Sequence, residues 1–136
     1  MSKILVVEDE EILRTALSEE LKQEGFEVAQ AKDGQEGVEK ALSEKPEIIL
    51  LDLVMPRLDG LGALRQMKEN PLTKQIPVVI LTNLSDYGKV SEALSLGAMD
   101  YLVKANYQLE ELINKIKVIL ARKDSPIPTS TPELQI

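Results

Sequence analysis

Residues 47–60 read Glu-Ile-Ile-Leu-Leu-Asp-Leu-Val-Met-Pro-Arg-Leu-Asp-Gly, an apolar run that stops at Asp52 and gives way to a loop. The run 48–51 has the length and composition of a strand that is buried on both faces of a parallel sheet. A carboxylate at the end of such a strand loses hydration, and this cost is tolerated most readily where the charge has a function. Asp52 is therefore the first candidate functional residue.

Polar side chains also follow three other apolar runs. These residues are Glu8 and Asp9 after the first run, Thr82 after the fourth and Lys104 after the fifth. Each alone also fits an ordinary role, as a helix-start acid, a cap, a turn residue or a solvated charge. Together at one sheet edge, acids, a hydroxyl and an ammonium group would form a site for a metal ion and a phosphoryl group.

The apolar runs alternate with longer amphipathic segments, which is the pattern of repeated βα units. The predicted strands are residues 3–7, 26–29, 47–51, 78–82 and 100–103. This order predicts an open, doubly wound α/β fold with five parallel strands, and the second strand, as the most polar, is expected at an edge. Ligands of such sheets bind outside the carboxyl ends of the strands, where the polar residues cluster.

Five helical patterns accompany the strands. The first covers residues 10–24, with Leu13, Ala16, Leu17 and Leu21 on one face, and the second begins at Asp33, with Glu36 as its capping-box partner. The third covers residues 60–70. The fourth covers residues 85–96 and is expected to bury Val90, Ala93 and Leu94, and the fifth follows Asn106 as a possible N-cap. The apolar stripe of the fifth helix, from Leu109 to Leu120, is interpreted as core packing. Residues 123–136 contain three prolines and are expected to be a disordered tail or the start of a linker after one domain, 1–122.

Composition excludes several function classes. With 16 Lys and Arg against 23 Asp and Glu, the net charge of −7 disfavours direct binding to nucleic acid or anionic membranes. The absence of Cys and His excludes thiol nucleophiles, Ser-His-Asp catalysis and zinc sites built on histidine. The apolar runs are too short to span a membrane, and the strand pattern from residue 3 leaves no room for a signal peptide. A cytoplasmic protein is therefore expected.

Taken together, the motifs resemble the receiver domain of bacterial two-component response regulators. The matching segments are Val7-Glu8-Asp9, Leu51-Asp52, Met55-Pro56 with Asp59-Gly60, Leu81-Thr82, Gly97-Ala98 with Asp100-Tyr101, and Val103-Lys104. The resemblance covers residues 3 to about 122. It implies a flavodoxin-like (βα)5 fold with strand order 2-1-3-4-5.

The resemblance also implies that Asp52 accepts a phosphoryl group from a histidine kinase or a histidine phosphotransfer protein, as in a phosphorelay. It implies that Mg²⁺ is held by Glu8, Asp9 and Asp52, together with the backbone carbonyl of Val54. These are hard oxygen donors of the kind that Mg²⁺ prefers. The chain would not be an enzyme in the ordinary sense, although it would catalyse its own Mg²⁺-dependent phosphorylation and slow dephosphorylation.

Thr82 and Lys104 would contact the phosphoryl group, and Tyr101 would turn inward as Thr82 moves toward it. The expected output surface is formed by the fourth helix, the fifth strand and the fifth helix. Plausible outward residues there are Tyr87, Lys89, Glu92, Lys115 and Lys117. The partner at this surface would be a downstream protein or a second copy of the chain.

Four positions depart from the usual receiver pattern. Ala105 stands where a proline, often cis, usually follows the lysine, which leaves open whether the Lys104–Ala105 bond is cis or trans. Asn83 replaces a small residue. Val54 and Leu84 are apolar where water must reach the acyl phosphate, which predicts slow self-dephosphorylation.

Two other classes of protein fit the sequence less well than a receiver. A phosphatase of the haloacid-dehalogenase type needs a second acid where Val54 stands, and a flavin carrier is disfavoured by an aromatic content of only 3%. A stand-alone receiver is favoured, with a fragment of a longer DNA-binding regulator and a phosphorylation-independent interaction module as alternatives.

Overall fold

The computed structural model describes residues 2–55, 57–82, 87–104 and 108–124. Strands and helices alternate through the whole of this part of the chain. In order they are β1 Lys3–Val7, α1 Glu11–Gln23, β2 Glu27–Ala31, α2 Gly34–Glu44, β3 Ile48–Asp52, α3 Gly60–Glu69, β4 Val78–Thr82, α4 Tyr87–Ser95, β5 Asp100–Val103 and α5 Leu109–Asp124. The expected succession of βα units is therefore confirmed.

The five strands form one parallel sheet in the order β2-β1-β3-β4-β5, as predicted, and β2 lies at an edge. The register pairs Val7 with Leu51, and Thr82 with Val103, so the carboxyl ends of β1, β3, β4 and β5 reach the same level. The polar residues that end these strands are thereby brought to one edge of the sheet.

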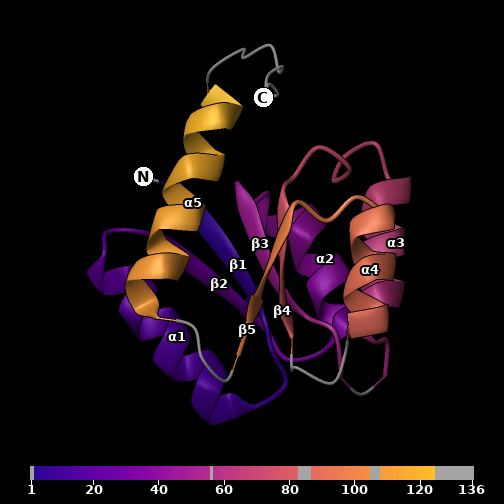
Figure 1. Ribbon diagram of the computed structural model, residues 1–136, viewed down its shortest axis with the longest axis horizontal. Helices are drawn as coiled ribbons and strands as arrows, with labels where there is room; N and C mark the ends of the chain where they lie inside the picture. The colour runs from indigo at the N-terminus through magenta and orange to yellow at the C-terminus, as the bar shows by residue number, and fades with distance from the viewer. Residues whose placement is uncertain (1, 56, 83–86, 105–107, 125–136) are drawn as a thin grey trace.

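Helices cover both faces of the sheet (Figure 1), with α1 and α5 on one side and α2, α3 and α4 on the other. Each face has its own apolar cluster. One contains Leu17, Leu21, Leu112, Ile113, Ile116 and Ile119, and the other contains Ala41, Ala63, Leu64, Met67, Val90 and Ala93. Strands β3 and β4 are buried along their whole length, because both of their faces are covered.

Two strands begin later than the sequence predicted. Residue Phe26 belongs to the turn after α1, because its N–H donates to Leu21 O at 3.2 Å, and β2 consequently runs from Glu27 to Ala31. Strand β3 includes Asp52, which pairs with Leu81 of β4. The acid is thus the last residue of a buried strand rather than the first residue of the loop.

Acidic side chains cap two of the helices. Asp33 Oδ1 accepts the N–H of Glu36 at 2.8 Å, and Asp59 Oδ1 accepts the N–H of Gly62 at 2.8 Å. The side chain of Glu36 accepts the N–H of Lys32 at 2.7 Å, one residue before the N-cap, so the predicted capping box is present in a shifted form. These caps fix where α2 and α3 begin.

Two predicted core positions are wrong: Leu94 is 41% exposed and Ala16 is exposed. Both helices contact the sheet over a narrower stripe than their apolar periodicity suggested. The apolar stripe of α5 packs on the sheet as expected, and α5 extends to Asp124. The predicted cap Asn106, residues 85–86 and the tail from 125 lie outside the described residues. No helix in the described part of the chain is long and apolar enough to cross a membrane.

Candidate functional site

Three carboxylates meet at the carboxyl edge of the sheet. Glu8 and Asp9 follow β1, and Asp52 ends the neighbouring strand β3. One oxygen of each residue lies within 4.8 Å of one oxygen of the other two. Glu8 is 0% exposed and Asp52 is 3% exposed, whereas Asp9 is exposed to solvent. The predicted acidic cluster is therefore brought together, with one side of it open.

Lys104 inserts its ammonium group between the two buried acids. Its Nζ lies 2.9 Å from Glu8 Oε1 and 3.1 Å from Asp52 Oδ2. The backbone N–H of Lys104 donates to Thr82 O at 2.7 Å, which continues the pairing of β4 and β5 beyond the strand ends. The lysine is thus positioned by the sheet itself and not only by its charge.

Backbone donors hold the remaining oxygens of both acids. The N–H of Val54 donates to Asp52 Oδ1 at 3.2 Å, and the N–H of Glu10 donates to Glu8 Oε2 at 3.1 Å. Within the described residues Glu8 Oε1 receives no aligned hydrogen bond, so its partner is the charge of Lys104 alone. A buried oxygen in this state would gain from a further cation.

The electrostatics of the site show the strain of burying like charges. Burial raises the pKa of Glu8 from 4.5 to about 7, and nearby Asp52 adds to this, while Lys104 and the Glu10 N–H oppose it. Burial also raises the pKa of Asp52 against the opposing charge of Lys104. Burial alone would lower the pKa of Lys104, but its contacts with Glu8 and Asp52 outweigh this, and its pKa is raised.

The donor set fits Mg²⁺. When ionised, three carboxylates against one ammonium leave an excess of two negative charges, since 3 − 1 = 2. All the side-chain donors are hard oxygens, and the exposure of Asp9 leaves room for the water ligands that Mg²⁺ usually retains. Glu8 and Asp52, which contact Lys104, would serve both the lysine and the metal ion.

The other predicted residues surround this cluster at different depths. Thr82 is buried at the end of β4, whereas Tyr101 is 38% exposed on β5 and Val54 is 47% exposed beside Asp52. Leu84, Asn83 and Ala105, and with Ala105 the Lys104–Ala105 bond, lie outside the described residues.

The predicted output surface is largely exposed. Lys89, Glu92 and Lys117 are exposed, and the side chain of Tyr87 lies outside the described part of the chain. Lys115 is only partly exposed, because its Nζ pairs with Asp100 Oδ2 at 2.9 Å, and it is therefore not a free outward charge.

Sequence reasoning missed Arg14, which fixes the backbone beside the acids. Its Nη1 donates to Glu8 O at 2.9 Å, and its Nε donates to Gln30 Oε1 at 3.3 Å. Arg14 therefore links α1 and β2 to the end of β1. The position of Arg14 on the first helix, a few residues after the acids, could have indicated this role, but an arginine on an amphipathic helix is usually a surface charge.

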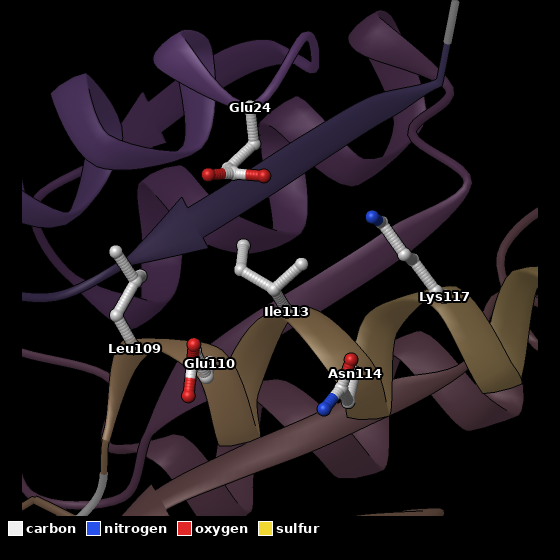
Figure 2. A pocket seen from close by; sticks show the side chains of 6 residues that line it. All are labelled: Glu24, Leu109, Glu110, Ile113, Asn114 and Lys117. Carbon is white, nitrogen blue, oxygen red and sulfur yellow. The ribbon is translucent and has the colours of Figure 1, made fainter.

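A separate cavity of about 420 Å³ lies on the side of the sheet that α1 and α5 cover. Figure 2 shows its lining, which comes from the end of α1 and from α5: Glu24, Leu109, Glu110, Ile113, Asn114 and Lys117. None of the clustered acids lines it, so this cavity is not the place of the proposed chemistry.

The fold and the site together define an open, doubly wound α/β protein with an acidic, lysine-containing site at the carboxyl edge of its sheet. Residues 4–117 match the family model of the response regulator receiver domain, and the chain therefore belongs to this family. The resemblance inferred from the motifs is confirmed. The family acts in two-component signalling, where phosphorylation and magnesium binding are typical.

Similar proteins include longer regulators. The chain is 44% identical over 124 residues to the response regulator ArlR of Staphylococcus saprophyticus, which covers 90% of this chain and 54% of the relative. It is 38% identical over 128 residues to the alkaline phosphatase synthesis transcriptional regulatory protein PhoP of Bacillus subtilis, covering 94% and 52%. The chain thus spans about half the length of the curated relatives it matches.

Solved structures of receiver domains have the same fold. A receiver domain protein from Clostridium thermocellum matches with a TM-score of 0.85 at 29% identity, covering 93% of this chain and 100% of that one. The receiver domain of a sensor histidine kinase from Pseudomonas aeruginosa, with a magnesium ion coordinated in its active site cleft, matches with a TM-score of 0.81 at 28% identity, covering 88% and 98%.

Proposed function

We propose that this receiver is a phosphorylation-activated signalling switch whose acceptor is Asp52. The observation that carries the proposal is the placement of Lys104 Nζ at 2.9 Å from Glu8 and 3.1 Å from Asp52 within one buried acidic cluster. A histidine kinase or a histidine phosphotransfer protein is the proposed donor. In the transfer, a carboxylate oxygen of Asp52 bonds to phosphorus, the donor's P–N bond breaks, and its electron pair stays on the imidazole nitrogen.

Most of the catalysis would come from positioning and from neutralising charge. Glu8, Asp9 and Asp52, with the backbone carbonyl of Val54, would hold Mg²⁺, which when bound offsets negative charge on the transferred group. Lys104 would exchange its contact with the Asp52 carboxylate for one with a phosphoryl oxygen. Thr82, at the neighbouring strand end, would donate its hydroxyl hydrogen to the same group.

The proposed output surface is formed by α4, β5 and α5, and Tyr101 links it to the site. Tyr101 is 38% exposed, so its ring is only partly packed, and it would turn inward when Thr82 shifts. A shallow cavity of about 490 Å³ on this surface is lined by Met99, Asp100, Glu111, Asn114, Lys115, Val118, Ile119 and Arg122. Its mixed charges and apolar residues suit a protein partner, either a downstream target or a second copy of the chain.

Two arrangements of the whole protein remain as proposals. One is a stand-alone cytoplasmic receiver that works by protein contact, with one domain over residues 1–122 and a tail beyond it. The other is the receiver part of a longer transcription regulator, which is favoured by the match to only 54% and 52% of the lengths of the relatives. In both, the receiver itself would contact neither nucleic acid nor membrane, in keeping with its net charge of −7.

The proposed function is tested by phosphotransfer from a purified, autophosphorylated histidine kinase. Transfer of label to the chain in the presence of Mg²⁺, and its loss when the metal is chelated, is expected. A chain that takes no label from any donor, although folded and supplied with Mg²⁺, would be the phosphorylation-independent interaction module instead.

A further inference from the structure

The side chain of Asp33, at the start of α2, connects that helix to the loop that follows Asp52. Asp33 is 3% exposed and uses its two oxygens differently. Oδ1 accepts the N–H of Glu36 at 2.8 Å and caps α2, whereas Oδ2 pairs with Arg57 Nη1 at 3.3 Å. One buried carboxylate therefore serves both a helix end and a loop.

Arg57 adopts a backbone conformation that an arginine does not choose by itself. Its φ of 66° lies in the left-handed region, which costs a residue with a Cβ free energy and persists where the surroundings enforce it. Its side chain is 68% exposed, so Asp33 is the anchor that the structure offers its guanidinium. The ion pair holds the loop in a backbone conformation from which it would otherwise relax.

The backbone of the loop lies directly on the same helix start. A Cβ added to Gly34 would sit 1.9 Å from Leu58 O, so only a glycine allows this approach. One turn later, a Cβ added to Gly37 would lie 2.9 Å from Val7 Cγ1. Val7 immediately precedes Glu8, and the N–H of Glu8 donates to Ala31 O at 3.0 Å, just before α2.

The start of α2 therefore contacts both segments that carry the acids, β1 through Gly37 and the loop after β3 through Gly34 and Asp33. We propose that the Asp33–Arg57 pair is a positioning device that sets the distance between the Asp52 side and the Glu8 side of the acidic cluster, and thereby the affinity for Mg²⁺. This inference rests on the proposed function, because it takes Mg²⁺ to be the ligand of the cluster.

The physical reason is the strict geometry of the ion. Mg²⁺ requires near-octahedral coordination at about 2.0–2.1 Å, so ligands that drift apart lose affinity steeply. Neither Asp33 nor Arg57 would touch the metal. Their effect would pass through the loop backbone to Val54, whose N–H donates to Asp52 Oδ1 at 3.2 Å. Supports of this kind commonly tune metal sites from outside the ligand set.

The test compares Arg57→Gln and Asp33→Asn with wild type. Asp33→Asn keeps an oxygen that can cap α2 and removes only the charge. Arg65→Gln is the matched control, because Arg65, like Arg57, is an exposed arginine in an ion pair, but its partner at 3.5 Å is Glu92 on α4 and not a residue of α2. The readouts are the Kd for Mg²⁺ by calorimetry and, without Mg²⁺, amide hydrogen exchange of Leu53 and Val54 by NMR.

We expect Arg57→Gln and Asp33→Asn each to weaken Mg²⁺ binding about two- to fivefold, the range of an ion pair with one solvent-exposed partner. The double variant should be no weaker than the worse single one, because the two residues act as a unit. Exchange at Leu53 and Val54 should accelerate in both, Arg57→Lys should recover most of the loss, and Arg65→Gln should change neither readout.

An unchanged Kd and unchanged exchange in both variants, or equal effects in Arg65→Gln, would overturn the inference. A melting temperature that falls while the Kd and the exchange stay constant would assign the pair a purely structural role and would overturn it as well. If wild type binds no Mg²⁺, the proposed function fails, while the exchange data still decide whether the pair holds the loop.

Discussion

Lys104 and Asp52 form an ion pair across the carboxyl edge of the sheet, with Nζ 3.1 Å from Oδ2. The pair joins the end of β5 to the end of β3, two strands that are separated by β4. A phosphoryl group on Asp52 would convert the partner of Lys104 from a carboxylate to a phosphoryl oxygen. Phosphorylation of Asp52 would therefore alter a contact of β5, the strand that carries Tyr101 and forms part of the proposed output surface.

The acidic cluster predicts that Mg²⁺ stabilises the folded protein. Glu8, Asp9 and Asp52 repel one another, and a ligand that binds only the folded state adds about 2.7 kcal/mol at a hundredfold excess over its Kd. The melting temperature should therefore rise with Mg²⁺, and the rise should be smaller in Asp9→Asn. Because Asp9 is exposed, this variant should fold normally. A melting temperature that does not change with Mg²⁺ up to high millimolar concentration would argue against a metal site formed by these acids.

Burial of Glu8 predicts a pH dependence of stability without metal. Its pKa is raised from 4.5 to about 7 in the folded protein, so the folded state holds a proton that the unfolded state has already released in this window. Stability must then fall as pH rises from about 4.5 to about 7. The raised pKa of Asp52 acts in the same direction, whereas that of Lys104 matters only at alkaline pH.

Urea titrations at a series of pH values in a chelating buffer measure this dependence. Glu8→Gln should flatten it, because the amide does not titrate. An equal slope in wild type and Glu8→Gln would mean that another group is responsible.

The buried hydroxyl group of Ser18 is expected to lower the stability of the folded protein. Its side chain on α1 is buried, and its Oγ has no hydrogen-bond partner among the described residues. A buried polar group without a partner costs about 1–3 kcal/mol, so Ser18→Ala should raise the free energy of unfolding. Ser91→Ala is the matched control, because Ser91 is exposed on α4 and reports only the helix propensity of alanine.

The expected difference between the two variants is about 1 kcal/mol in favour of Ser18→Ala, by urea unfolding. Equal effects in both variants would show that the buried hydroxyl carries no penalty.

Because Val54 is apolar, we expect the phosphoryl group on Asp52 to be lost slowly. Its apolar side chain is 47% exposed beside Asp52 and cannot orient an attacking water. Replacing it in Val54→Asn, together with Leu84→Glu, should shorten the lifetime of the phosphorylated chain. Timed loss of label after removal of the donor measures this lifetime. An unchanged lifetime would place the control of dephosphorylation elsewhere.

Most of the candidate site could be predicted from the polar residues that end the strands. A parallel sheet puts the carboxyl ends of its strands at one level, so the sequence alone assigns Glu8, Asp52, Thr82 and Lys104 to one edge. The strand order itself came from the resemblance. These features depend on local patterns and on a single topological rule.

Contacts between distant segments could not be predicted in this way. The pairing of Asp33 with Arg57 depends on how the loop after β3 settles on α2, and no periodicity encodes that approach. Leu94 was misassigned because periodicity gives the apolar face of a helix but not how much of that face the sheet covers. Asp52 was placed one residue outside its strand because strand ends follow the pairing partner, here Leu81.

The central claim is tested most directly by mapping the phosphorylated residue. The chain is incubated with a small phosphodonor and Mg²⁺, the acyl phosphate is trapped by reduction with borohydride, and the modified peptide is identified by mass spectrometry. Asp59→Asn is the control, since Asp59 lies in the same loop and its amide can still cap α3. Modification at Asp52 in wild type and Asp59→Asn, with none in Asp52→Asn, is the expected result. Full modification of Asp52→Asn, or modification of wild type at another acid, would contradict the account.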